Sequence, residues 1–170
     1  MKNTYLKQSQ QLFLLSKQEL NKARQLDDDN LARDASGKAW IATTDALRGF
    51  LLIHGVTEKQ LPKSERQRHD MLGEFGDDRM RSLYYYVRSE LHENAYYEGM
   101  INYMLLFEAL NKVKKFIHRC GNGGKGTDGR RKGIENPSKG IENSNKGIEN
   151  SGKGIENSGK GIENSGKGIE

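Results

Sequence analysis

Apolar residues recur at the spacing of an α-helix through most of the first 120 residues. Residues 4–26 carry one apolar stripe without Gly or Pro, which predicts a first helix over that range. The stripe consists of Leu6, Leu12, Phe13, Leu15, Leu20 and Ala23. The turn-forming residues Asp27 to Asn30 follow, and a second helix is predicted from about Asn30 to His54, where Gly55 ends the pattern.

The apolar face of the second predicted helix is made mostly of alanine. Its members are Ala32, Ala35, Ala39, Ala42, Ala46, Phe50 and Ile53. Such small side chains allow a neighbouring helix to approach closely, while Trp40, Leu47 and Leu51 supply bulk beside them.

The second half of this region predicts two more helices. A capping box at Ser64 and Gln67 begins the third, which Gly73 and Gly76 interrupt before it continues to about residue 91. A fourth helix of roughly 25 residues is predicted from about Asn94. Because no segment alternates like a strand, we expect an all-α fold, an antiparallel four-helix bundle with a broken third helix.

The last 50 residues differ sharply in composition from this region. They hold fourteen of the 20 glycines, and Lys-Gly-Ile-Glu-Asn recurs in them every seven residues from Lys132. One Ile per repeat is too little for a coiled coil, and such a chain buries too little apolar surface to fold. We therefore expect a helical domain over residues 1–119, a Gly-rich linker over 120–131 and a disordered repeat tail over 132–170.

Charge and cysteine content exclude several classes of protein. The chain has 28 Lys plus Arg against 23 Asp plus Glu, and the first 120 residues carry a net charge of only +3, which is weak for a dedicated nucleic-acid surface. No apolar run suits a signal peptide or a membrane span, so we expect a cytoplasmic protein without membrane contact. The lone Cys120 and the scattered histidines indicate neither a disulfide nor a metal site, and nothing indicates a cofactor.

The most reactive set of side chains lies just before the last predicted helix. Arg88 and His92 are four residues apart and share a helix face, and Tyr96 and Tyr97 follow one turn later. Such a set is suited to binding phosphate or to cleaving RNA, with His92 as the proton shuttle and Arg88 as the charge stabiliser. The alternative is an ordinary polar cap whose tyrosines pack in the bundle or at a dimer interface.

Two segments resemble the HEPN superfamily. They are ARDASGKAWIATTDALRGFLLIHG, from Ala32 to Gly55, and LHENAYYEGM, from Leu91 to Met100. The resemblance covers residues 1–119 and is greatest to an uncharacterised bacterial branch, a domain of unknown function. It implies a bundle of four or five helices that is often dimeric and often an RNase or toxin component, with a motif of Arg, four to six residues, and His.

That motif matches this sequence only in part. By position it falls on Arg88 and His92, which have three residues between them, and by spacing it falls on Arg48 and His54 in the second helix. The preferred hypothesis is therefore a homodimeric, HEPN-like module that binds a protein partner, a nucleotide or RNA, in a toxin-antitoxin or defence context. Its partner would be a nucleotidyltransferase or an antitoxin-like protein. The alternative is a metal-independent RNase that uses Arg88 and His92.

Overall fold

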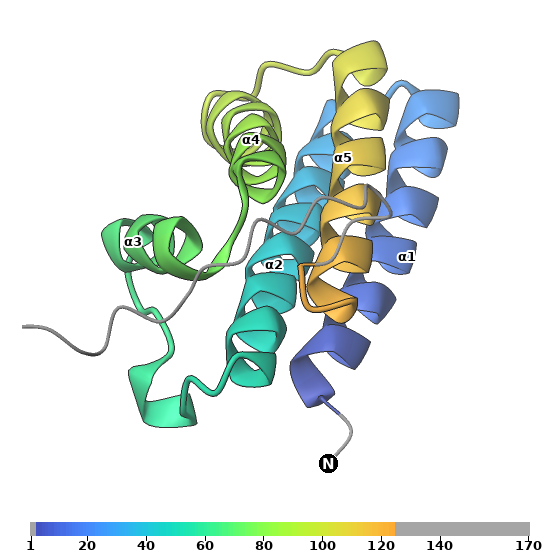
Figure 1. Cartoon of the computed structure of the whole chain (residues 1–170). Helices are drawn as coiled ribbons and strands as arrows, with labels where there is room; N and C mark the ends of the chain where they lie inside the picture. Colours follow the sequence, from blue (N-terminus) through green and yellow to red (C-terminus); the bar gives the residue numbers. More distant parts are fainter. Residues whose placement is uncertain (1–2, 125–170) are drawn as a thin grey trace, which may run out of the picture. The chain divides into compact units, whose positions relative to one another are not determined.

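A computed structural model describes residues 3–124 of the chain, and the repeat tail and most of the predicted linker lie outside that range. All regular structure in the described part is helical (Figure 1). The elements are α1 (Thr4–Leu26), α2 (Asp29–Ile53), the 3₁₀ turn η1 (Glu58–Gln60), α3 (Glu65–Phe75), α4 (Asp78–Val87), the π-helix η2 (Arg88–Tyr97) and α5 (Tyr103–Gly121). The predicted all-α fold class is thus confirmed for these residues.

A two-residue turn joins α1 to α2, so the two helices lie side by side (Figure 1). Asp27 adopts the left-handed conformation, with φ of 53°, and ends α1. The Asp28 side chain then accepts a hydrogen bond from the Leu31 N–H and caps α2. The two aspartates of this turn therefore end α1 and begin α2.

The contact between α1 and α2 is close because small residues face each other. The Ser9 hydroxyl donates to the Ala42 carbonyl at 2.7 Å, and both residues are fully buried. The Ser16 hydroxyl donates to the Ala35 carbonyl at 2.8 Å in the same way. Because each buried hydroxyl is satisfied by the partner helix, serine serves here as an interface residue, which the apolar pattern does not reveal.

Helix α2 lies at the centre of the bundle and contacts α1, α5, η2, α3 and α4 (Figure 1). The five alanines of its predicted apolar face are fully buried. The largest fully buried side chains around that face include Phe50, Leu51, Leu72, Met80, Tyr84, Leu91, Leu106 and Phe116. Leu15 and Ile53, which the periodicity places on buried stripes, are instead 42% and 49% exposed.

The third predicted helix is broken as expected. Helix α3 ends at Phe75, and the Asp77 side chain accepts a hydrogen bond from the Met80 N–H at 2.7 Å to begin α4. The predicted start of the last helix near Asn94 is wrong. The chain continues from α4 directly into the π-helix, and the Asn102 side chain caps α5 at Tyr103.

The last helix also ends later than the sequence indicates. Helix α5 continues to Gly121, so Cys120 is a buried core residue and not the first residue of a linker. Among residues 3–124, no helix has the length and apolar character needed to cross a membrane.

Candidate functional site

The four candidate residues Arg88, His92, Tyr96 and Tyr97 all lie on the π-helix η2. Its hydrogen-bond pattern continues past its end, where the Glu98 N–H donates to the Glu93 carbonyl five residues earlier, at 3.0 Å. π-helical segments are rare, are usually limited to a single turn, and occur often at functional sites. A ten-residue π-helix is therefore the least ordinary element of this fold.

Arg33 of α2 holds the end of the π-helix. Its Nε donates to the Tyr96 carbonyl, and its Nη2 donates to the Tyr97 carbonyl at 3.4 Å. The same guanidinium lies 5.7 Å from the centre of the Tyr96 ring. These contacts satisfy carbonyls at a helix end, where a positive charge is favourable.

The Tyr96 ring lies directly against the backbone of α2 at Gly37. A Cβ atom at residue 37 would lie 2.9 Å from both Cδ2 and Cε2 of that ring, closer than real side chains approach. Gly37 is thus required for this contact because a methyl group would displace the ring.

Aromatic rings from α2 and η2 meet at this place. His92 stacks on Trp40, with ring centres 4.8 Å apart and planes at 20°. Tyr96 lies nearly parallel to His92 at 6.3 Å, and Tyr97 meets His92 edge-on at 4.7 Å. The tyrosines expose 38% and 61% of their surface, so the cluster extends from the core to solvent.

A pocket of about 390 Å³ lies beside these rings. We call it the aromatic pocket. It is lined by Asp34, Gly37, Lys38, Trp40, Ile41, His92 and Tyr96. Its size is within the usual range of ligand sites, and it combines aromatic walls with a few polar groups, as such sites do.

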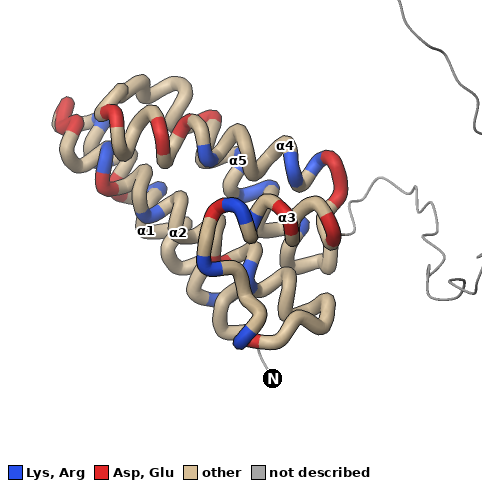
Figure 2. Tube along the Cα trace, turned by 90° about the vertical axis from the view of Figure 1, so that its left-hand side faces the viewer, with Lys and Arg blue, Asp and Glu red and all other residues tan. Residues whose placement is uncertain are grey.

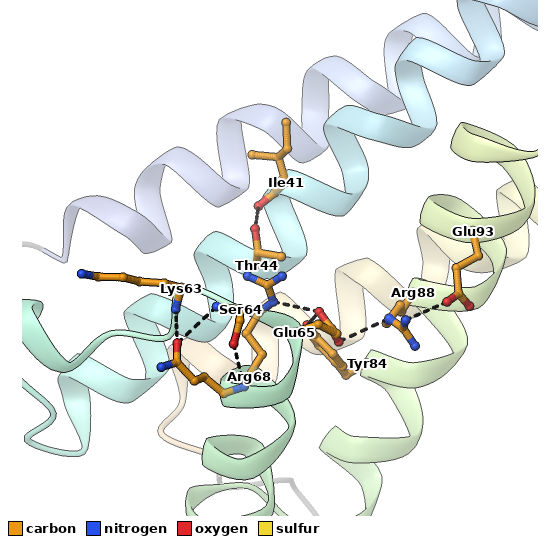
Figure 3. Close-up of polar contacts among 10 residues, drawn as sticks. Ile41, Thr44, Lys63, Ser64, Glu65, Arg68, Tyr84, Arg88 and Glu93 are labelled. Carbon is orange, nitrogen blue, oxygen red and sulfur yellow. Dashed lines mark hydrogen bonds and ion pairs between the residues drawn. The ribbon is translucent and has the colours of Figure 1, made fainter.

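Arg88 does not contribute to that pocket. Its Nη2 lies 2.7 Å from Oε1 of Glu93, and its Nε lies 3.3 Å from Oε1 of Glu65 (Figure 3). Glu65 is also paired through Oε2 with Arg68 at 2.9 Å and accepts a hydrogen bond from the Tyr84 hydroxyl at 3.2 Å. This network links α3 and α4 to the π-helix, and the charge of Arg88 is matched by two carboxylates.

His92 is half-buried, and burial lowers its pKa below the ordinary value. The carboxylates of Glu65 and Glu93 oppose this shift, and the nearby charge of Arg88 adds to it. The ring is therefore neutral at pH 7. Its Nδ1 is buried without a hydrogen-bond partner among the described residues.

The structure thus brings together only part of the predicted site. His92, Tyr96 and Tyr97 form one ring cluster, whereas Arg88 faces away into the ion-pair network. Arg48 and His54, the pair selected by motif spacing, have separate partners. Arg48 pairs with Asp45, and His54 packs against the rings of Phe50 and Phe75. Within residues 3–124, no group of three or more acidic, histidine or cysteine side chains is arranged to hold a metal ion.

Six residues of this site are missing from the set predicted from the sequence. They are Arg33, Asp34, Gly37, Lys38, Trp40 and Ile41. All six lie in α2, some fifty residues before the π-helix, and no local motif marks them as a site. The one available signal was Gly37, because glycine within a helix costs about 1 kcal/mol relative to alanine and so indicates a packing reason.

Comparison of the chain with protein-family models, with curated proteins and with solved structures found no match.

Proposed function

We propose that the chain is a module that binds a protein partner, and that the aromatic pocket is its binding site. The observation that carries this proposal is that contacts within the fold hold the aromatic wall of the pocket in place. The π-helix is held against Gly37 by the contacts of Arg33 and Tyr96, and this leaves stacked rings beside an unfilled space of about 390 Å³. Preformed pockets with aromatic walls are the usual sites of recognition.

Exposed apolar residues that follow Tyr96 along the chain favour a protein over a free nucleotide as the partner. Tyr97 ends the π-helix, Met100 lies in the loop after it and Met104 lies in the first turn of α5, and they expose 61%, 64% and 75% of their surface. Grouped apolar side chains of this kind are typical of protein interfaces. A second copy of the chain is one such partner, in line with the homodimer expected from the resemblance.

We further propose that the fold is the antiparallel four-helix bundle of a HEPN-like domain. Contacts between α1 and α2, α2 and α5, α1 and α5, and α4 and α5 support this arrangement, with η2 extending α4 along α2. The same resemblance supports a toxin-antitoxin or defence context, in which the partner would be an antitoxin-like protein or a nucleotidyltransferase.

The RNase remains the second candidate, and the state of His92 favours it. A neutral imidazole with a lowered pKa is the form that a general base requires. The position of Arg88 opposes it, because a guanidinium already bound by Glu65 and Glu93 would have to leave both carboxylates to stabilise a phosphate.

Selection of random peptides on the immobilised full chain tests the binding proposal. We expect the selected peptides to converge on a shared pattern and to lose binding to Tyr96→Ala. A matched control is Tyr5→Ala, which removes a tyrosine from the first turn of α1 outside the pocket. Peptides that do not converge, or that bind Tyr96→Ala as tightly as the unmodified chain, would contradict the proposal.

Incubation with total RNA, with and without EDTA, tests the RNase. Metal-independent cleavage that disappears in His92→Ala would support the RNase and contradict the binding-module proposal. Absence of cleavage by both the unmodified chain and His92→Ala would exclude the RNase.

A further inference from the structure

The rim of the aromatic pocket carries a carboxylate, that of Asp34, which forms no ion pair with the described residues. Asp34, Lys38 and Ile41 follow one another along one face of α2 and line the pocket on the side of that helix. The Lys38 ammonium lies 2.7 Å from Oε2 of Glu19, so its charge is matched. Asp34 is exposed and forms no ion pair or hydrogen bond with any residue in the described range 3–124. The pocket therefore combines aromatic walls with an unmatched negative charge.

Further acidic residues lie at the same end of the bundle. Asp27 and Asp28 form the turn between α1 and α2, and Asp29 begins α2. Their charges add to burial in raising the pKa of Tyr103 at the start of α5. Figure 2 shows both acidic and basic segments at this end, farthest from the N-terminus. Beside the carboxylates themselves a cation is attracted more strongly than a phosphate.

The arginines nearby are already engaged. Arg33 donates to the carbonyls at the end of the π-helix, and Arg88 lies between Glu65 and Glu93. No ion pair joins either guanidinium to Asp34. A partner can therefore supply the cation that pairs with this carboxylate.

We propose that the aromatic pocket accepts an arginine side chain of the partner protein, with the guanidinium against the rings and paired with Asp34. This inference rests on the proposed function, because it names the chemistry of the group that enters the same pocket. Arginine suits the site better than lysine, because its planar head can stack on a ring and pair with a carboxylate in two-pronged fashion.

Two observations within the fold support this choice of cation. Arg33 already places a guanidinium over the Tyr96 ring, at 5.7 Å, so this ring is an established partner for such a group. His92 is kept neutral by burial, so the pocket wall does not repel an entering cation at pH 7.

The test is a titration of the full chain with acetyl-Gly-Arg-Gly-amide. Trp40 is the only tryptophan of the chain and lines the pocket, so its fluorescence and its indole N–H resonance report binding. We expect saturable binding, at least tenfold weaker for the same peptide with citrulline, which has the size of arginine without its charge. The lysine peptide should also bind more weakly than the arginine peptide.

Asp34→Asn should weaken binding of the arginine peptide about fivefold, in the range of an exposed ion pair. Asp34 has no partner among the described residues, so this variant should fold normally, which a urea titration checks. Glu74→Gln is the matched control, because it removes one exposed carboxylate from α3, outside the pocket. It should bind as the unmodified chain does.

Equal binding of the arginine and citrulline peptides, unchanged binding by Asp34→Asn, or no binding of the arginine peptide would each overturn the inference. Tighter binding of guanosine monophosphate than of the peptide at Trp40 would overturn it in favour of a nucleotide. If selected peptides without arginine bind at Trp40 and lose binding to Tyr96→Ala, the proposed function stands and only the arginine inference fails. If no selected peptide binds there, both fail.

Discussion

Replacement of Gly37 by alanine perturbs the candidate site at one defined contact. In a helix interior without steric conflict, Gly→Ala stabilises a protein by about 0.5–1 kcal/mol. At Gly37 the new methyl group would lie 2.9 Å from two atoms of the Tyr96 ring. Overpacking of this kind costs about 1–3 kcal/mol, so the net result should be a loss of about 1 kcal/mol in the free energy of unfolding.

Gly73→Ala is the matched control for this substitution. Gly73 is an exposed residue of α3, and a Cβ atom there would meet nothing within 4 Å. It should therefore raise the free energy of unfolding by about 0.5–1 kcal/mol. The two variants should differ by about 2 kcal/mol in urea unfolding followed by far-ultraviolet circular dichroism.

A double variant identifies the cause of the difference. With Tyr96→Ala already in place, the ring is gone, and Gly37→Ala should become stabilising, as at Gly73. If Gly37→Ala is as stable as Gly73→Ala while Tyr96 is present, Tyr96 does not pack on Gly37 and the described pocket wall is wrong.

Three further predictions concern the groups that hold the π-helix. Arg33→Gln removes the hydrogen bonds from its guanidinium to two carbonyls and should lower the free energy of unfolding, measured by urea titration, by about 1 kcal/mol. Arg24→Gln is the control, because it leaves those two hydrogen bonds in place. Glu65→Gln should lower the free energy of unfolding by about 1–2 kcal/mol at low salt and by less at 1 M salt, because Glu93 then remains as the one carboxylate paired with Arg88. A loss that does not depend on salt would argue against an electrostatic role for Glu65. Burial lowers the pKa of His92 in the folded state, so the unfolded chain binds the proton more readily and stability should decline as pH falls below about 6.5. In His92→Asn that part of the decline should vanish, and an unchanged pH profile would show that His92 is not the group responsible.

Local signals predicted most of the helices. The range of α1 follows from an uninterrupted stripe, and the break before α4 follows from Gly76 and the cap residue Asp77. The predicted start of the last helix near Asn94 is wrong because the helical spacing of apolar residues extends back from α5 to Asn94 without a break. Gly99, which adopts a φ of 67°, and the cap at Asn102 are the local signals that mark the true boundary.

The candidate site depends on tertiary contacts that no local pattern contains. The residues His92, Tyr96 and Tyr97 were predicted from their types and spacing, and they do form a cluster. The engagement of Arg88 arises from Glu65, which lies 23 residues earlier in a different helix. The pocket itself requires Gly37, whose importance follows only from the ring packed against it.

The most direct test of the account is to map where a selected peptide binds on the ¹⁵N-labelled full chain. We predict that chemical-shift changes concentrate at residues 34–41 of α2 and 92–97 of the π-helix and include the Trp40 indole. Changes concentrated instead at the apolar groove between α1 and α5, which Phe13, Leu14 and Ile117 line, would contradict the assignment of the aromatic pocket as the binding site.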